Sequence, residues 1–334
     1  MTAVRRIPII DISSLDTDSA DRPSVIDLIA AAARDWGFFQ ITGHGVSHRL
    51  IGQVSGEARA FFALSLETKR GVARTRETTR GYYDRELTKN RRDLKEVFDF
   101  GVESDARLLE DGSHRRPSVD GVNRWPDNRP RFRRTMLEYQ RACERLSLAL
   151  VRALCAGLGV HDEALVPHFS PTHTGFTRLN YYPLDDPLEP ETAVTVTDLG
   201  DMALHHHSDA GALTVLLQDD VGGLQVGAPD VEGWIDVTPT DRALVINLGD
   251  MMQIWSNDRY RAALHRVRPI TDRPRYSMPF FFNPAYDTKV APLVATPAKP
   301  AKYRPVNWGD FRQARADGDF ADYGHEIQIA DFRL

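Results

Sequence analysis

The spacing of hydrophobic positions changes near residue 170. Before that point the clearest pattern is helical, because apolar residues recur every three or four positions between residues 130 and 158. The apolar stripe comprises Phe132, Met136, Tyr139, Cys143, Leu146, Leu150 and Leu154. We expect one long helix over residues 130–158, packed along a sheet.

The N-terminal third mixes short apolar runs with helical patterns. Residues 7–10 and 38–41 are typical of strands. A helix is predicted to open at Pro23 and to end at Gly37, and a second helix to run from about residue 47 to residue 62. Residues 72–128 are rich in Arg, Thr, Asp and Gly and have weak periodicity. Such a composition predicts long loops, which often carry binding residues.

From residue 177 onward, short apolar runs alternate with turn residues. The predicted strands cover residues 177–182, 213–218, 223–226, 234–237, 243–248, 265–267 and 277–282. Many short strands at intervals of about ten residues favour a β-sandwich or barrel. We expect residues 1–334 to form a single unit. It would have a mixed α/β part with a helical shell (1–170), a β core (171–290) and a C-terminal extension (291–334).

Charge and composition narrow the range of partners. The chain has 334 residues and a net charge of −5, with 42% hydrophobic and 27% charged residues, as in ordinary globular proteins. Nucleic-acid binding draws on clustered basic residues, and the basic run at residues 91–95 is balanced by Asp93, Glu96 and Asp99. We interpret this run as a solvated or substrate-facing edge and expect no nucleic-acid partner.

The two cysteines and the N-terminal residues indicate in which cellular compartment the protein is expected. Cys143 and Cys155 lie 12 positions apart in one predicted helix, a separation of about 18 Å that no disulfide spans. The N-terminus has no secretory apolar segment, and no run of 18 apolar residues occurs. We therefore expect a cytoplasmic protein without a membrane partner, and the sequence leaves its oligomeric state open.

A metal site is indicated by His207, Asp209 and His265. Residues two apart on a strand point to the same face, so His207 and Asp209 could bind one ion together. His265 begins another predicted strand and could supply a third ligand. Two histidines and one carboxylate on one face of an octahedral ion form the facial triad of non-haem iron(II) oxygenases. A His-x-Asp triplet also arises by chance, and the same ligands could hold zinc in a hydrolase.

A second pair of residues indicates an anion site. Arg275 and Ser277 share one face of a predicted strand that continues into apolar residues 278–282. A guanidinium can donate two parallel hydrogen bonds to a carboxylate. An arginine beside so apolar a segment needs an anionic partner, which could be a ligand or a structural acidic residue.

With these motifs, the chain resembles the isopenicillin N synthase-like branch of the iron(II)/2-oxoglutarate dioxygenases over nearly its whole length. Residues 7–11 and 35–46 are similar to the family's opening motifs, and residues 179–183 to the segment that precedes the metal triplet. The triplet at residues 207–209, His265 and the segment 275–277 follow in the family's order.

The resemblance implies a mainly β fold with α-helices, in which a distorted double-stranded β-helix (jelly roll) is flanked by helices. By position, His207, Asp209 and His265 would bind Fe(2+), and Arg275 and Ser277 would hold the distal carboxylate of 2-oxoglutarate. Further positions implied are Asn180 and Tyr182 for the co-substrate, and Phe281 against the substrate or in the core. His205 is expected outside the ligand set, and His44 in a structural turn.

The implied activity is the oxidation, most commonly the hydroxylation, of a small organic molecule. Dioxygen and 2-oxoglutarate would be consumed, succinate and CO2 would be co-products, and ascorbate would be an optional reductant. Tyr83 and Lys95 are candidate substrate contacts, or else a packed tyrosine and a surface charge. Three alternatives remain: an iron oxidase of the same fold that does not use 2-oxoglutarate, a zinc hydrolase that uses the same ligands, and a non-catalytic jelly roll that binds small molecules. The substrate and the reaction subtype are not predicted.

Overall fold

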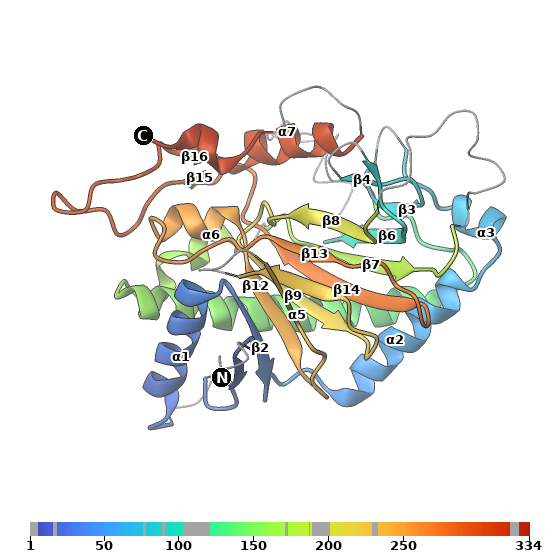
Figure 1. Cartoon of the computed structure of the whole chain (residues 1–334), viewed down its shortest axis with the longest axis horizontal. Helices are drawn as coiled ribbons and strands as arrows, with labels where there is room; N and C mark the ends of the chain where they lie inside the picture. Colours follow the sequence, from blue (N-terminus) through green and yellow to red (C-terminus); the bar gives the residue numbers. More distant parts are fainter. Residues whose placement is uncertain are drawn as a thin grey trace.

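Two β-sheets pack against each other at the centre of the molecule (Figure 1). The computed structural model describes residues 6–15, 19–75, 78–88, 91–102, 121–170, 173–186, 188, 201–228, 233–320 and 327–334. Leu216 and Val245 of the larger sheet pack in one buried cluster with Val226 and Val267 of the smaller sheet. This apolar layer makes the two sheets the halves of one sandwich.

The larger sheet has eight strands in the order β1-β2-β12-β9-β14-β7-β6-β3. These are β1 (Ile9–Asp11), β2 (Phe38–Thr42), β12 (Leu244–Leu248), β9 (Leu213–Gln218), β14 (Arg275–Phe282), β7 (Phe176–Tyr182), β6 (Glu96–Gly101) and β3 (Gly81–Tyr83). The smaller sheet has the order β11 (Trp234–Asp236), β10 (Leu224–Gly227), β13 (His265–Val267) and β8 (Leu204–His207). Two hairpins stand apart from them: β4 (Leu87–Thr88) with β5 (Arg91–Arg92), and β15 (Lys289–Val290) with β16 (Val306–Asn307).

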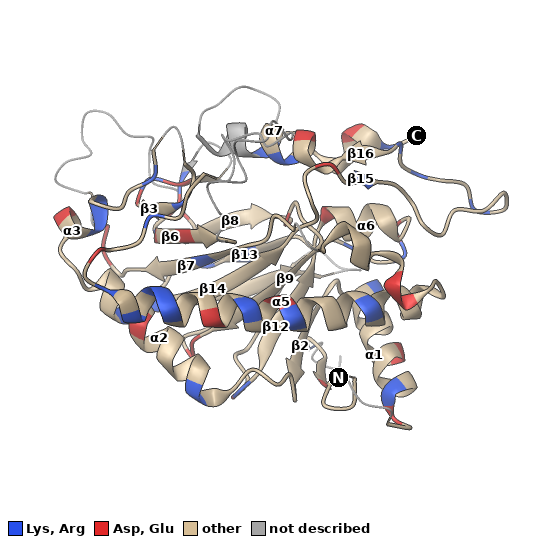
Figure 2. Ribbon diagram, turned by 180° about the vertical axis from the view of Figure 1, so that it is seen from behind, with Lys and Arg blue, Asp and Glu red and all other residues tan. Residues whose placement is uncertain are grey.

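Helices cover the outer face of the larger sheet (Figure 2). On this face lie α1 (Arg22–Asp35), α2 (His48–Phe62) and α5 (Pro130–Leu158), and charged residues are spread along α5. The shorter helices are α3 (Leu66–Arg70), α6 (Asp250–Trp255), η2 (Asp162–Ala164), η3 (Val166–His168) and η4 (Ile329–Phe332). Helix α7 (Trp308–Phe320) lies near the C-terminus, on the side of the smaller sheet.

Helix α5 confirms the predicted helix with the same bounds. Every residue of its apolar stripe is buried, and the stripe belongs to the large core between the helices and the sheet. The helix ends at Gly159, whose φ of +76° suits a residue without Cβ. Cys143 and Cys155 are both buried and unpaired, as their spacing predicted.

Gly37 marks the turn between α1 and β2. Its φ is +66°, and a Cβ built there would lie 2.2 Å from the carbonyl oxygen of Arg261. Only glycine fits so close an approach. The turn delivers β2 into the larger sheet, where it pairs antiparallel to β12.

The expectation of long loops over residues 72–128 is wrong for part of that range. Strands β3 and β6 extend the larger sheet, and all six residues of β6 are buried. The acidic side chains of β6 hid the strand pattern, because they are paired inside the protein: Glu96 with Lys69, and Asp99 with Arg178. Residues 103–120 lie outside the described part of the chain.

The interpretation of residues 91–95 as a solvated edge is also wrong. Arg92, Asp93 and Lys95 are each at most 4% exposed, because buried carboxylates neutralise the two cations. Strands from residues 1–170 share the larger sheet with strands from residues 171–290, and the division of the chain stays a prediction. None of the helices in the described ranges is long and apolar enough to cross a membrane.

Candidate metal centre

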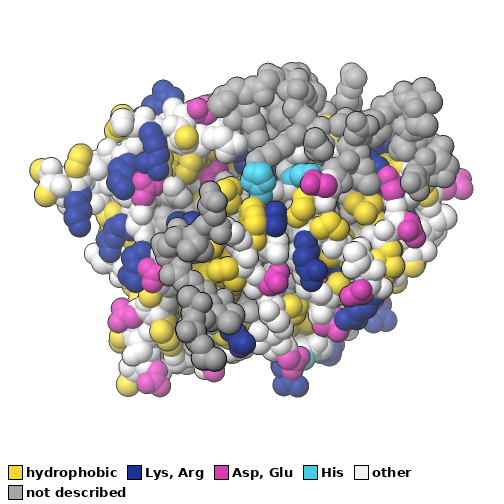
Figure 3. Space-filling view, viewed as in Figure 1, with side chains coloured by type: hydrophobic (Ala, Val, Ile, Leu, Met, Phe, Trp, Pro, Cys, Tyr) yellow, Lys and Arg dark blue, Asp and Glu magenta, His cyan; other side chains and the backbone are white. Residues whose placement is uncertain are grey.

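His207 and His265 lie side by side on the smaller sheet. They are paired residues of the antiparallel strands β8 and β13, and their ring centroids are 4.3 Å apart. Strand β8 ends at His207, so Asp209 projects from the segment just beyond it. One ligand atom from each of these three residues lies within 4.8 Å of the other two. Histidine, basic and hydrophobic side chains gather on this face of the molecule (Figure 3).

The two imidazoles point their Nε2 atoms at the same carboxylate oxygen. The Nδ1 atom of His207 donates to the carbonyl of His205 at 2.9 Å, and that of His265 donates to the carbonyl of Ala263 at 3.2 Å. In a neutral imidazole that donates through Nδ1, the Nε2 atom carries a lone pair. Both Nε2 atoms lie 3.7 Å from Oδ1 of Asp209. Two imidazole nitrogens and one carboxylate oxygen that converge in this way fit a bound cation.

Asp209 is oriented by its second oxygen. Its Oδ2 accepts hydrogen bonds from Thr214 Oγ1 at 2.5 Å and Asn247 Nδ2 at 2.7 Å, which leaves Oδ1 to face the histidines. Such partners behind a ligand fix its direction. Sequence reasoning missed both residues. The available signal was a polar residue within a mainly apolar strand, Thr214 in 213–218 and Asn247 in 244–248.

The protonation states suit metal binding near neutral pH. Burial, together with the neighbouring His265, lowers the pKa of His207 to about 3, so this imidazole is neutral. Burial alone would raise the pKa of Asp209, but the two histidines and its hydrogen bonds outweigh burial and hold that pKa below the ordinary value. A carboxylate and neutral imidazoles are the forms that ligate metals.

His205 is held away from this cluster, as expected. Its Nδ1 lies 3.0 Å from Oδ1 of Asp93, and its backbone N–H donates to the same oxygen. His44 also has the structural place predicted for it, since its ring nitrogens bond to the carbonyl of Arg242 and the N–H of Val46.

Arg275 is a buried cation on the inner face of the larger sheet. Its side chain is 1% exposed, lies over the ring of Tyr182 at 4.9 Å, and donates to Ser277 Oγ at 3.2 Å and to Gln218 Oε1 at 3.5 Å. Asn180 also donates to Ser277 Oγ, at 3.2 Å. Within the described ranges no carboxylate pairs with this guanidinium, and its Nε has no partner. A buried guanidinium of this kind fits an anionic ligand.

The three candidate substrate contacts lie in different environments. Phe281 stacks on Phe176 with centroids 4.7 Å apart, and it is the cross-strand partner of Thr214. Tyr83 lies under the guanidinium of Arg74 at 5.1 Å. Lys95 is 4% exposed and pairs with Glu86 at 2.8 Å and Asp93 at 3.2 Å. Phe281 therefore neighbours Thr214, and Lys95 lies inside an ionic network.

Comparison with known proteins decides the family. Residues 7–128 match the family described as the N-terminal region of non-haem dioxygenases in morphine synthesis, and residues 173–284 match the 2OG-Fe(II) oxygenase superfamily. The chain belongs to the 2OG-Fe(II) oxygenase superfamily. It is a non-haem iron(II)- and 2-oxoglutarate-dependent dioxygenase, and its cofactors are Fe(2+), 2-oxoglutarate and O2.

Relatives of this dioxygenase occur in plants and fungi. Jasmonate-induced oxygenase 4 of Arabidopsis thaliana is 32% identical, over 92% of this chain and 81% of its own length. The 2-oxoglutarate-Fe(II) type oxidoreductase hxnY of Emericella nidulans is 33% identical, over 91% and 87%.

Solved structures share the jelly-roll fold. JOX2 in complex with 2OG, Fe and JA is 30% identical, with a TM-score of 0.76 over 92% of this chain and 84% of its own. A full-length Neurospora crassa protein in complex with alpha-KG and thymine is 25% identical, with a TM-score of 0.78 over 96% and 99%. The fold and family implied by the sequence motifs are thereby confirmed.

Proposed function

We propose that His207, Asp209 and His265 hold the catalytic iron of this dioxygenase, and that Arg275 and Ser277 hold the distal carboxylate of 2-oxoglutarate. The observation that carries the proposal is the convergence of three ligand atoms within 4.8 Å of one another. The fit to iron rests on the donor set, since two imidazoles and one carboxylate leave three positions open on an octahedral ion. The fit to 2-oxoglutarate rests on the buried guanidinium of Arg275.

When bound, iron with 2-oxoglutarate and O2 supplies an oxidant for an unactivated C–H bond, with succinate and CO2 as co-products. The residues of the chain do the positioning. The carbonyls of His205 and Ala263 hold the rings of His207 and His265 with Nε2 directed inward. Thr214 and Asn247 keep one oxygen of Asp209 occupied.

The residues proposed to hold 2-oxoglutarate, Arg275 and Ser277, are buried, and their polar groups are the ones that would contact its carboxylate. The hydroxyl of Ser277 accepts from both Arg275 and Asn180, so its own proton can be donated to a bound carboxylate. Tyr182 lies beneath Arg275 and belongs to the apolar layer between the sheets. This layer excludes water behind the guanidinium, which strengthens its attraction for an anion.

The substrate we propose is a small organic molecule, hydroxylated at a carbon that lies next to the iron. Support comes from the molecules named with relatives, JA with JOX2 and thymine with the Neurospora crassa protein. An oxidase that does not use 2-oxoglutarate and a zinc hydrolase would each leave the buried Arg275 without an anionic partner. The 2-oxoglutarate-dependent relatives also speak against them.

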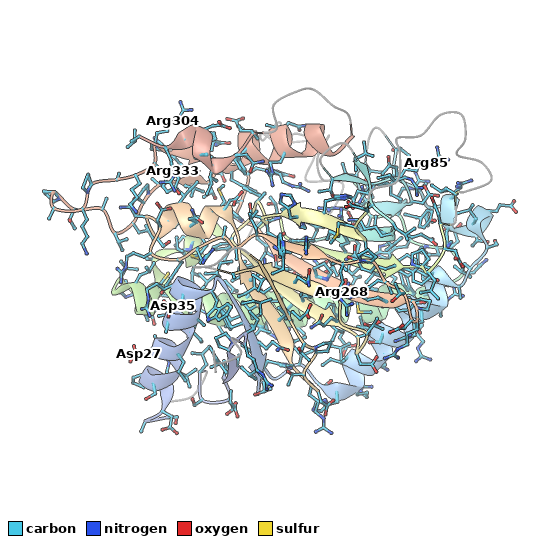
Figure 4. All side chains as sticks on the ribbon, in the orientation of Figure 1. Asp27, Asp35, Arg85, Arg268, Arg304 and Arg333 are labelled. Carbon is cyan, nitrogen blue, oxygen red and sulfur yellow. The ribbon has the colours of Figure 1, made fainter. Side chains whose placement is uncertain are left out.

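Succinate formation by purified variants tests the co-substrate site. Arg275→Gln should raise the KM for 2-oxoglutarate by about tenfold or more, because a charge-assisted bidentate contact is lost. Ser277→Ala should raise it by about two- to fivefold, the value of one hydrogen bond. Arg268→Gln is the matched control, since Arg268 is exposed (labelled in Figure 4). An unchanged KM in Arg275→Gln would remove this residue from the co-substrate site.

A further inference from the structure

A stacked pair of aromatic rings lies on the face of the larger sheet that also carries Thr214, a hydrogen-bond partner of Asp209. Phe281 of β14 pairs across the strands with Phe176 of β7 on one side and with Thr214 of β9 on the other. Cross-strand partners point to one face, and Thr214 bonds to the carboxylate of Asp209 on that face. Phe176 and Asn180 are four residues apart on β7, about 13 Å along the strand. The aromatic pair therefore lies farther along β7 and β14 than Asn180 and Ser277, the residues proposed for the co-substrate.

Two arginines from distant segments lie over the ring of Phe176. The guanidinium carbon of Arg80 is 4.7 Å from the ring centroid, and that of Arg312 is 5.3 Å from it. Arg80 is 3% exposed and packs against Gly101, where an added Cβ would lie 2.9 Å from its Nη2. The absence of a side chain at Gly101 thus makes room for the guanidinium of Arg80 beside Phe176. Arg312 comes from α7 and is partly exposed.

Two further cations near Phe176 are paired with carboxylates. Arg178, two residues from Phe176, pairs with Asp99 at 2.9 Å and with Glu86 at 2.6 Å, and Arg74 pairs with the same two carboxylates. Two positive and two negative groups close this ring of ion pairs. For Arg312, by contrast, the described residues offer no carboxylate within ion-pair distance, and its contact is with the ring of Phe176.

Helix α7 is fixed relative to the metal cluster. Arg315, one turn after Arg312, donates to the carbonyl of Ser208 at 3.2 Å, and Ser208 stands between the proposed ligands His207 and Asp209. Arg315 also donates to the carbonyl of Ile327 at 3.3 Å. A group bound at Arg312 would therefore be held at a set distance from the iron.

We infer that the substrate is a small organic acid, whose apolar body lies against Phe176 and Phe281 and whose carboxylate binds Arg312 of α7. The inference rests on the proposed function and names the substrate class for the same site. A guanidinium binds a carboxylate bidentately, and an apolar body with one charged end would be oriented by these two contacts. Positioning of this kind selects the carbon that faces the metal.

Binding of simple acids to the iron- and 2-oxoglutarate-loaded enzyme under nitrogen tests the inference. The probes are 3-phenylpropionate, phenylacetate and cyclohexylacetate, each compared with its primary amide. The readouts are calorimetry and the change in the visible charge-transfer band. At least one acid should bind at about 10 mM or below, at least about tenfold more tightly than its amide. Amides that bind as well as the acids, or no acid binding at that concentration, would overturn the inference.

Three variants assign the binding to Arg312. Arg312→Met should weaken the acid about tenfold or more and leave the amide unchanged, and Arg312→Lys should restore part of the affinity. Arg304→Met is the matched control, because Arg304 stacks on Phe332 at 4.8 Å and lies near the C-terminal end (Figure 4). Equal acid affinity in Arg312→Met and wild type would overturn the assignment. A wild-type enzyme without the charge-transfer band would instead contradict the proposed iron and 2-oxoglutarate sites.

Discussion

At the scale of single residues, the metal centre depends on which atoms carry protons. The Nδ1 atoms of His207 and His265 donate hydrogen bonds to backbone carbonyls. One oxygen of Asp209 accepts hydrogen bonds from Thr214 and Asn247. The remaining ligand atoms converge because each proposed ligand is oriented by a hydrogen bond on its opposite side. Residues that never touch the metal should therefore control its affinity.

Replacing Asn247 should weaken iron binding without changing the ligand set. Asn247→Ala removes one of the two donors to Oδ2 of Asp209, and loss of such a partner typically lowers metal affinity about 10–100-fold. Competition with a chelator under nitrogen measures the affinity. Gln225→Ala is the control, since this amide bonds to Asp236 and Arg266 instead. Equal iron affinity in Asn247→Ala and wild type would contradict this role.

The proposed ligands stand out in the sequence, whereas the residues that orient them do not. His207, Asp209, His265, Arg275 and Ser277 stand in motifs of fixed local spacing. Thr214 and Asn247 act through the register between β9 and β12, in which they are cross-strand partners. That register follows from long-range pairing, for which no local pattern exists.

At the scale of elements, one buried carboxylate joins the hairpin β4–β5 to the smaller sheet, which carries the proposed histidine ligands. Asp93, which follows β5, is completely buried; it accepts from the backbone and ring of His205 on β8, and also from Thr88 at 2.7 Å. Its other neighbour is Lys95 at 3.2 Å. One carboxylate therefore connects the hairpin to the strand that precedes the ligands.

Removing that carboxylate should destabilise the fold. Asp93→Ala should lower the free energy of unfolding by about 3 kcal/mol, because hydrogen bonds are lost and buried cationic groups lose a partner. Urea denaturation measures the change. Asp220→Ala is the control and should change stability little, since its pair with Arg273 is solvent-exposed. Similar stability losses in the two variants would contradict the anchoring role of Asp93.

Element prediction succeeded where burial and polarity agree. The helix at residues 130–158 was found at both ends, because its apolar stripe runs from a helix-starting proline to a glycine with positive φ. Strands β3 and β6 were missed because charged residues within and around them are buried in pairs. Composition cannot distinguish a compensated interior charge from a solvated one.

At the scale of the whole molecule, the ionic network beside the site links stability to pH. Burial would raise the pKa values of Glu86 and Asp99, but Arg178 and other cations outweigh it and hold both pKa values below their ordinary range. Carboxyls with depressed pKa values bind fewer protons in the folded than in the unfolded state, so their stabilisation is present above the unfolded pKa of about 4. It is lost as the pH falls through the folded pKa.

Acid denaturation should therefore report on this network. The free energy of unfolding of the wild type should fall as the pH is lowered below about 4.5. Glu86→Gln should be less stable at neutral pH and should show a shallower fall on the acid side, because one linked carboxyl is gone. Urea denaturation at a series of pH values measures both effects. An equally steep acid-side fall in Glu86→Gln and wild type would contradict the linkage.

The central claim is that His207, Asp209 and His265 bind one catalytic iron, and anaerobic Fe(II) titration of alanine variants tests it most directly. His206 is the matched control, because it is adjacent to His207 in the sequence and its ring centroid lies 6.1 Å from that of Trp234. We predict one iron per chain in the wild type and in His206→Ala, and a loss of at least about tenfold in affinity in His207→Ala, Asp209→Ala and His265→Ala. Iron binding that survives in His207→Ala but is lost in His206→Ala would contradict the account.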